Sequence, residues 1–115
     1  METVSLYSDY VNERLGETVI EEEWGFISFH VEPALGTVIL NDIYIRPEDR
    51  KKGRGVELVR KVEQAVKAFG CNTMIGYIWP SANGSTLAMR AALANGFSLH
   101  GIEGPGIILK RSLEV

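Results

Sequence analysis

A change of hydrophobic period in the middle of the chain constrains the fold more than any other feature. Residues 37–45 are rich in Thr, Val, Ile and Leu, which is typical of a strand, and Pro47 prevents that strand from continuing. A helix is predicted over residues 54–69, because one apolar stripe recurs through Gly55, Val59, Val62, Val66 and Phe69. Residues 73–79 are again typical of a strand. A strand, a helix and a strand in this order form a right-handed crossover, so the two strands are predicted to be parallel.

The segments on either side of this crossover complete a small mixed sheet. Helices are predicted at residues 4–15 and 81–94, and further strands at residues 18–22, 24–31, 97–100 and 107–110. Gly16 and Gly70 are placed to end helices, and Ser81 or Ser85 to cap the last one. The expected fold class is α/β (α+β): a mixed, mostly antiparallel sheet with helices on its faces, in a single domain of residues 1–115.

The charge balance and the single cysteine argue against several classes of protein. The net charge is -3 and the pI about 5.4, which gives no overall attraction to nucleic acid or to an anionic membrane. No apolar run approaches the ~20 residues of a spanning helix, and the first residues lack the basic flank of a signal peptide. Cys71 has no internal cysteine to pair with, and no spacing of His, Cys and Asp indicates a metal site. We therefore expect a cytoplasmic protein with no metal and with no nucleic-acid or membrane partner.

The turn before the central helix has the features of a phosphate site. Cations and glycines alternate there as Arg50, Lys51, Lys52, Gly53, Arg54 and Gly55. The first amides of a helix lack intrahelical partners and carry partial positive charge, and glycine lets an anion approach the backbone closely. An ordinary basic turn before a helix would have the same composition, so both interpretations stay open at this point. The following Val56-Glu57 excludes a Walker loop, and the lack of a third glycine excludes a dinucleotide fingerprint.

Residues 43–55, Ile-Tyr-Ile-Arg-Pro-Glu-Asp-Arg-Lys-Lys-Gly-Arg-Gly, resemble the acetyl-CoA-binding motif of the GNAT superfamily. The downstream runs Ala88-Met89-Arg90 and Asn95-Gly96-Phe97 resemble a second motif of the same family. The resemblance covers residues 18–110 or thereabouts. It implies an N-acetyltransferase that moves the acetyl group of acetyl-CoA directly to an amine, on a small molecule or on a protein. It also implies a sheet that splays apart around the pantetheine arm of the cofactor.

The same resemblance assigns residues to the cofactor. The backbone of Ile43, Tyr44 and Ile45 would hold the pantetheine arm. The pyrophosphate would lie on the turn and the first helical residues, Arg50, Lys51, Lys52, Gly53, Arg54, Gly55 and Val56. Asn83 is shifted by one position from the asparagine that commonly opens the last helix in the family, and we include it in the predicted cofactor site.

Two departures from the family pattern favour another function. Ala92 occupies the position where the family often has a tyrosine that protonates the leaving thiolate. One short helix precedes the first strand, where the family usually has a strand and two helices. The alternative is therefore a non-catalytic GNAT-like CoA-binding or structural protein, of a kind that phages also encode. A reduced N-terminal part should also leave apolar surface uncovered, which predicts a homodimer.

Four side chains are candidates for proton transfer. Asp42, late in the central strand, is the first candidate for the general base, and His30, on the preceding strand, is the second. Tyr77, on the strand across the expected cleft, could replace the missing acid, as could Tyr44. Each has a structural alternative: a polar residue bonded to the backbone at the splay for Asp42, and ordinary packing for His30 and for the tyrosines.

The acidic run Glu21-Glu22-Glu23 has two interpretations as well. Three adjacent carboxylates could attract a cationic acceptor amine. A solvated hairpin turn between two strands is the interpretation that the sequence favours.

Overall fold

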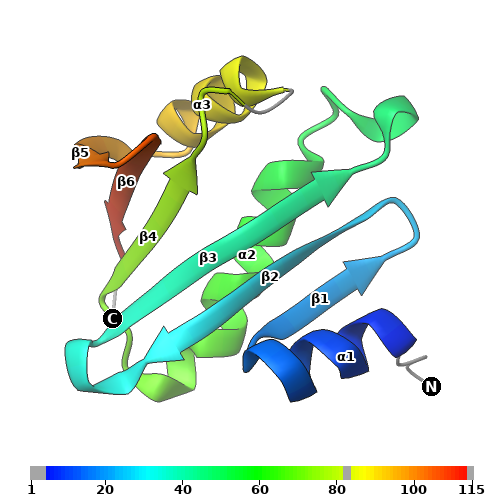
Figure 1. The fold of residues 1–115 in the computed structure, drawn as a ribbon, viewed down its shortest axis with the longest axis vertical. Coiled ribbons are helices and arrows are strands. Elements are labelled where there is room, and N and C mark those ends of the chain that lie inside the picture. The colour runs from blue at the N-terminus through cyan, green and yellow to red at the C-terminus, as the bar shows by residue number, and fades with distance from the viewer. Residues whose placement is uncertain (1–4, 82–83, 114–115) are drawn as a thin grey trace.

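A six-stranded mixed sheet is the frame of the molecule, seen in a computed structural model that describes residues 5–81 and 84–113 (Figure 1). The strand order is β1-β2-β3-β4-β6-β5. The strands are β1 (Thr18–Glu22), β2 (Gly25–Glu32), β3 (Thr37–Ile45), β4 (Thr73–Ile78), β5 (Ser98–Glu103) and β6 (Gly106–Ser112). The helices are α1 (Leu6–Leu15), α2 (Arg54–Val66) and α3 (Ser85–Ala94). Short 3-10 turns lie between β2 and β3 at Pro33–Leu35, before α2 at Pro47–Asp49 and after α2 at Lys67–Phe69.

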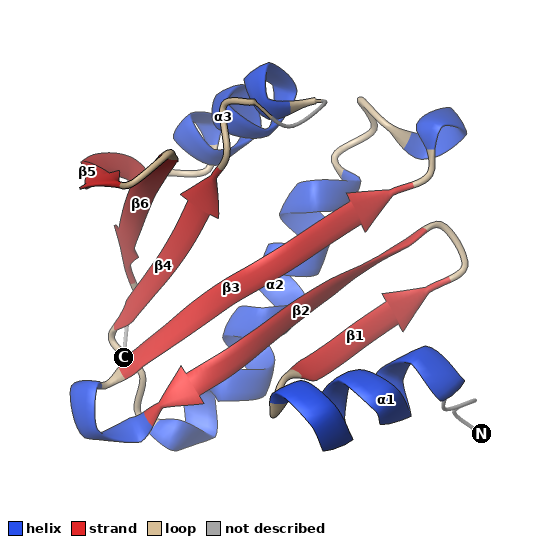
Figure 2. Ribbon diagram, viewed as in Figure 1, coloured by secondary structure: helices blue, strands red, loops and turns tan. Residues whose placement is uncertain are grey.

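The topology confirms the predicted fold class. β1, β2 and β3 form an antiparallel meander, and β5 and β6 form a hairpin that joins the sheet through β6 (Figure 2). β3 and β4 are the parallel pair, and α2 connects them across one face of the sheet. The predicted crossover is therefore present, with the turn at residues 50–53 between its first strand and its helix.

The core lies between the sheet and α2. The amphipathic helix buries Leu58, Val62 and Val66 completely or almost so, against the sheet residues Ile27, Val38 and Met74. Phe69 was predicted on this face and is 64% exposed, so that prediction was wrong. The α-helix ends at Val66, and the tighter 3-10 turn that follows changes the angle per residue and carries Phe69 out of the stripe. We call this side of the sheet the α2 face.

The opposite side of the sheet, the α1 face, is covered in part by the N-terminal helix. Ser5 caps α1, with its Oγ accepting a hydrogen bond from the backbone N–H of Ser8 at 3.0 Å, and Gly16 ends it in the left-handed conformation as predicted. The ring of Tyr7 packs on that of Phe26 with the centroids 5.1 Å apart. α1 therefore covers the β1–β2 end of the sheet, and no other helix of residues 5–81 and 84–113 covers β4, β5 and β6 on that face (Figure 1).

The last helix begins differently from the sequence prediction. Gly84, in the left-handed conformation, precedes the first residue of α3, and the hydroxyl of Ser85 donates to the carbonyl of Pro80 at 3.0 Å. A serine cap was therefore the wrong prediction. Ala92 packs against the core, as does the buried Phe97 just before β5.

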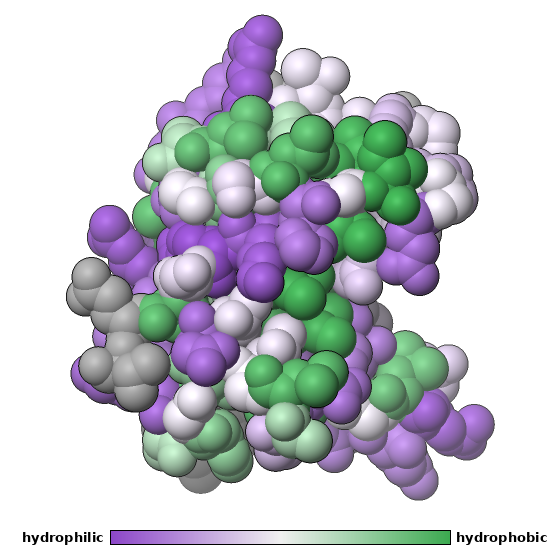
Figure 3. All heavy atoms as spheres, turned by 90° about the vertical axis from the view of Figure 1, so that its left-hand side faces the viewer, coloured by the Kyte–Doolittle hydropathy of each residue, from purple (hydrophilic) through white to green (hydrophobic). Residues whose placement is uncertain are grey.

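The sheet has two edges, β1 and β5. β5 carries two large apolar side chains at the surface, Leu99 and Ile102. Leu93, on the neighbouring helix, is also exposed. Figure 3 faces this side of the molecule and shows hydrophobic side chains gathered in its upper half.

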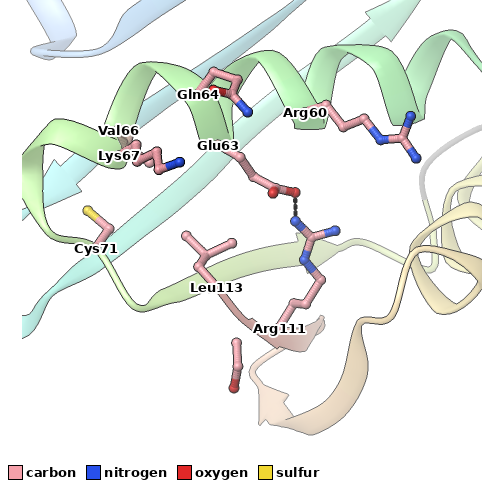
Figure 4. A pocket seen from close by; sticks show the side chains of 9 residues that line it. Arg60, Glu63, Gln64, Val66, Lys67, Cys71, Arg111 and Leu113 are labelled. Atoms are coloured by element: carbon pink, nitrogen blue, oxygen red, sulfur yellow. Dashed lines mark ion pairs between the residues drawn. The ribbon is translucent and has the colours of Figure 1, made fainter. Parts of the chain in front are cut away.

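A half-buried ion pair joins α2 to the last strand. The guanidinium of Arg111 pairs with the carboxylate of Glu63 and donates to the carbonyl of Asn95 at 3.0 Å (Figure 4). Burial, and to a lesser extent the charge of Arg60, lowers the pKa of Arg111. A cavity of about 420 Å³ lies beside this pair, with Cys71 and Leu113 among its walls. Because the protein itself supplies the partners of Arg111, we interpret this cluster as a structural contact between α2 and β6 and not as a ligand site.

Candidate active site

Strands β3 and β4 separate after only three residue pairs. Their parallel ladder joins Thr37 to Thr73, Val38 to Met74 and Ile39 to Ile75. Residues 40–45 continue β3 with no partner in β4 among the described residues, and the two strands diverge above this point (Figure 1). Backbone groups of β3 that β4 would otherwise satisfy are therefore left for a ligand that enters between the strands. Two of them already have side-chain partners, because Asp42 bonds the Ile43 N–H and Arg50 bonds the Ile45 carbonyl.

An extra residue in β3 marks the start of this separation. Ser28 pairs with Asp42 and Phe29 with Leu40, so Asn41 has no counterpart in β2 and forms a bulge. A bulge bends its strand and increases its twist. It also reverses the alternation of side chains along β3. Ile43 therefore lies on the α2 face beside its cross-strand partner Ile27, and Asp42 lies on the α1 face.

The space between the strands is a cleft of about 510 Å³. Its floor contains core residues such as Ile27 and Leu109, and small residues of α3 form one wall. Asp42 and Tyr77 also line it, from strands β3 and β4. By the alternation along each strand these two side chains belong to the α1 face, so residues of both faces line the cleft.

The N-terminus of α2 opens beside this cleft. Gly53 precedes the helix in the left-handed conformation with φ 78°, and Lys51 is also left-handed at φ 63°. No side chain among the described residues caps this end. The first amides of α2 therefore have no side-chain cap, and such amides are suited to an anion. Gly55 lines the cleft itself, and a Cβ added there would meet no atom within 4 Å.

The cations of the turn have different partners. Arg50 donates from Nε to the carbonyl of Ile45 at 2.8 Å and lies 5.7 Å from the centroid of the Tyr44 ring. Arg54 pairs with Glu57 at 3.1 Å and covers the ring of Trp24 at 4.6 Å. Lys51 and Lys52 are exposed, with the Lys52 ammonium 3.9 Å from Asp49. The two arginines thus hold the turn in place through protein contacts, and the two lysines extend into solvent.

The predicted catalytic side chains are divided between the cleft and the surface. Asp42 and Tyr77 line the cleft. The Asp42 Oδ1 accepts the backbone N–H of Ile43 at 2.9 Å, which is the contact expected of a polar residue at the splay. His30 is not among the cleft-lining residues; its Nδ1 is 2.9 Å from the Asn41 amide and its Nε2 3.2 Å from Glu32. Asn83, predicted at the cofactor site, lies outside the described residues.

Sequence analysis did not identify the wall that α3 contributes. Ser85, Ala88, Ala91 and Ala92 line the cleft together with Trp79. The small side chains of this helix could have indicated the wall from the sequence, because they leave room beside the diverging strands. Ala92, the position of the family's tyrosine, faces this space, so no phenol reaches the cleft from that point.

Three further observations concern other kinds of site. Within residues 5–81 and 84–113, no three His, Cys, Asp or Glu side chains are grouped as metal ligands. No helix in that part of the chain has the length and apolar character required to cross a membrane. Cys71 is buried, and its burial raises the pKa of its thiol, as expected of a packed cysteine rather than a nucleophile.

A mixed sheet that opens between two parallel strands, with an uncapped helix N-terminus beside the opening, is the architecture of a CoA-dependent acyltransferase. The chain belongs to the acetyltransferase (GNAT) family, whose model matches residues 6–97. This confirms the resemblance noted in the sequence. No curated protein matches the chain.

Solved structures show the same fold at low sequence identity. An acetyltransferase from Bacillus subtilis in complex with CoA has a TM-score of 0.70 and 19% identity, over 99% of this chain and 96% of that one. The ribosomal-protein-S18-alanine N-acetyltransferase from Escherichia coli has a TM-score of 0.67 and 15% identity, over 99% and 80%. The PaiA N-acetyltransferase from Thermoplasma acidophilum, in complex with coenzyme A, has a TM-score of 0.69 and 21% identity over 78% of this chain. The chain spans about half of that protein, 54% of its length.

Proposed function

We propose that this protein is an acetyl-CoA-dependent N-acetyltransferase that transfers the acetyl group directly to an amine. The observation that carries the proposal is the loss of β3–β4 pairing after Ile39 and Ile75, next to an uncapped helix N-terminus. A pantetheine arm bears amides, which require backbone partners, and β3 beyond Ile39 has no pairing with β4 to occupy its backbone. Two of its groups already have partners, since the Ile43 N–H donates to Asp42 Oδ1 and the Ile45 carbonyl accepts from Arg50 Nε. The arm would therefore use the remaining groups among residues 43–45 or displace these contacts. Pyrophosphate requires donors and positive potential, and the amides from Gly53 to Val56 supply both.

The reaction requires two proton transfers, and two cleft residues are placed for them. The attacking amine must lose a proton, which the Asp42 carboxylate accepts. Attack on the thioester carbonyl then forms a C–N bond and breaks the C–S bond. The leaving thiolate takes a proton, for which the Tyr77 phenol is the donor in the absence of a tyrosine at Ala92. No metal and no covalent enzyme intermediate take part in this scheme.

The alternative, a GNAT-like protein that binds CoA without catalysis, rests on one specific observation. Ala92 lines the cleft where the family's tyrosine would be, so the usual acid is absent. The two functions predict different turnover but the same binding of CoA. An assay that follows release of the CoA thiol with a panel of amines separates them.

The CoA site itself is tested at Gly55. This position has an ordinary helical backbone and open space around it, so Gly55→Val should fold normally. The added side chain would stand where the phosphate approaches. Calorimetry should show an affinity for CoA lower by about tenfold or more, the loss expected when charge-assisted hydrogen bonds are displaced.

Ala65→Val is the matched control for this variant. Ala65 is exposed on the same helix and away from the cleft, so the substitution adds the same kind of side chain without approaching the ligand. It should bind CoA as the unmodified protein does. If Gly55→Val also binds with unchanged affinity, the phosphate does not lie on this turn.

A further inference from the structure

The α1 face carries an aromatic row, Tyr7, Phe26 and Tyr44, and its last member lies two residues after Asp42, which lines the cleft. The ring centroids of Tyr7 and Phe26 are 5.1 Å apart, and those of Phe26 and Tyr44 are 6.1 Å apart. Tyr7 and Tyr44 remain 41% and 45% exposed. The row therefore presents aromatic surface to solvent on the same face as Asp42, two residues before Tyr44 on β3.

Carboxylates lie around this aromatic row. The strand register places Glu21, Phe26 and Tyr44 side by side across β1, β2 and β3. The Glu21 carboxylate accepts hydrogen bonds from the hydroxyls of Ser5 at 2.5 Å and Ser8 at 3.2 Å, which hold it against the first turn of α1. Glu22, by contrast, pairs with Lys61 of α2, and Glu23 lies in the turn. Of the three adjacent glutamates, Glu21 is the one placed beside the aromatic row.

The electrostatic environment of Tyr7 agrees with this arrangement. Burial raises the pKa of its phenol, and the charges of Asp42, Glu17 and Glu21 raise it further. The phenol consequently stays neutral near pH 7, and negative potential surrounds the ring. Arg50 is the cation that the described contacts place on the row, and its Nε is already bonded to the Ile45 carbonyl. Aromatic faces beside carboxylates attract a cation by two independent effects.

The reacting nitrogen of an acceptor cannot be that cation, because an amine must be neutral when it attacks a thioester. We propose, on the basis of the acetyltransferase function proposed above, that the acceptor carries two amines. One amine is acetylated in the cleft beside Asp42, and the other stays protonated over the aromatic row next to Glu21. By strand geometry the Cα atoms of Asp42 and Glu21 are about 12 Å apart, with components of about 7 Å along β3 and about 10 Å across to β1. The cation site lies over the aromatic row between these two residues, so the two nitrogens are closer together than the two Cα atoms and within the reach of a flexible aliphatic diamine.

The test compares 1,5-diaminopentane with 1-aminopentane, which differ by one ammonium group. We expect the kcat/KM of acetylation to favour the diamine by about tenfold, the size expected for one cation over an aromatic ring together with one partly exposed ion pair. Glu21→Gln should bring this ratio close to one. Glu23→Gln removes the same charge from the same hairpin and should retain the preference. A wild-type ratio near one, or a preference that survives Glu21→Gln, overturns the inference.

A direct titration keeps this inference separate from the proposed function. Calorimetry of 1,5-diaminopentane into the protein, with and without CoA, should show binding that Glu21→Gln weakens and Glu23→Gln does not. If CoA binds but no amine is acetylated, the proposed function fails, and diamine binding of this pattern still supports the cation site. If the diamine does not bind, or binds Glu21→Gln equally well, the cation site is wrong whatever the activity.

Discussion

Asp42 follows the bulge at Asn41, and that placement determines which face its carboxylate occupies. It lines the cleft, lies away from the turn that would hold pyrophosphate, and bonds to the backbone at its own strand. Asp42→Asn keeps the shape of the side chain and removes its basicity. We therefore expect the rate constant of transfer to fall by about 100-fold or more, with the dissociation constant of CoA little changed.

His30 is the competing candidate for the base, and it gives this prediction its control. His30→Gln should keep turnover, since the imidazole is held by Asn41 and Glu32 outside the cleft. Single-turnover rates and CoA titrations of both variants are the measurements. If the rate loss follows His30→Gln instead, the assignment of the base to Asp42 is wrong. If Asp42→Asn loses CoA binding, the residue is structural.

Cys71 should make the stability of the fold sensitive to alkaline pH. The residue is 5% exposed, and burial raises the pKa of its thiol above the ordinary value of 9.0. The neutral thiol is thus favoured in the folded state. Its contribution to stability is complete below the ordinary pKa and is lost as the pH rises through it toward the raised value. Urea denaturation should therefore show the wild type losing more free energy of unfolding above pH 9 than Cys71→Ala. Equal losses would contradict this.

At the scale of the element, the hydrophobic stripe of α2 tests how burial follows from sequence. Leu58 is completely buried although it was not assigned to the stripe, and Phe69 was assigned to it and is exposed. Leu58→Ala should cost about 3 kcal/mol in free energy of unfolding, because it leaves a cavity against the sheet. Phe69→Ala should cost about 0.5 kcal/mol or less, as for an ordinary surface change. Chemical denaturation of both variants measures the difference, and comparable costs would refute the burial pattern.

The elements were predictable from sequence because each has a local cause. The β-branched run of β3, the three- and four-residue spacing of α2, and the prolines and glycines between them act within a few residues. The glycine-rich turn before α2, which we propose for the cofactor phosphates, was predictable for the same reason. The bulge at Asn41 was not, since it depends on how β2 pairs with β3, and the faces of Asp42 and Tyr44 depend on the bulge. The α3 wall of the cleft was missed because it is defined by the size of side chains packed in three dimensions.

At the scale of the molecule, the splayed sheet separates two tasks. The α2 face holds the hydrophobic core and the helix N-terminus proposed for the cofactor phosphates. The α1 face holds the aromatic row and the carboxylates proposed for the acceptor. Because residues of both faces line the cleft, donor and acceptor could approach the reacting atoms from opposite sides of the sheet. The chain overall is acidic, with a net charge of -3, so the basic turn is a local exception.

The homodimer predicted from the sequence now has a specific surface to test. β5 is an edge strand, and an edge strand with exposed apolar side chains is a template for pairing with another strand. Leu99 is 66% and Ile102 77% exposed on that strand. Two copies related by a twofold axis could pair their β5 edges antiparallel and bury these four side chains together, since an isologous contact uses the same surface twice.

We therefore expect light scattering at micromolar concentration to give twice the chain mass of 12.7 kDa. Replacing Leu99 and Ile102 with Lys should convert the protein to a monomer, because each ammonium would meet its symmetry mate in the paired edge. Leu35→Lys is the control: Leu35 is 72% exposed in the 3-10 turn between β2 and β3, so its substitution should leave the dimer intact. CoA affinity should be the same in all three proteins, since none of these residues lines the cleft. A wild-type monomer at that concentration would refute the dimer, and a dimer that survives the double substitution would place the contact elsewhere than β5.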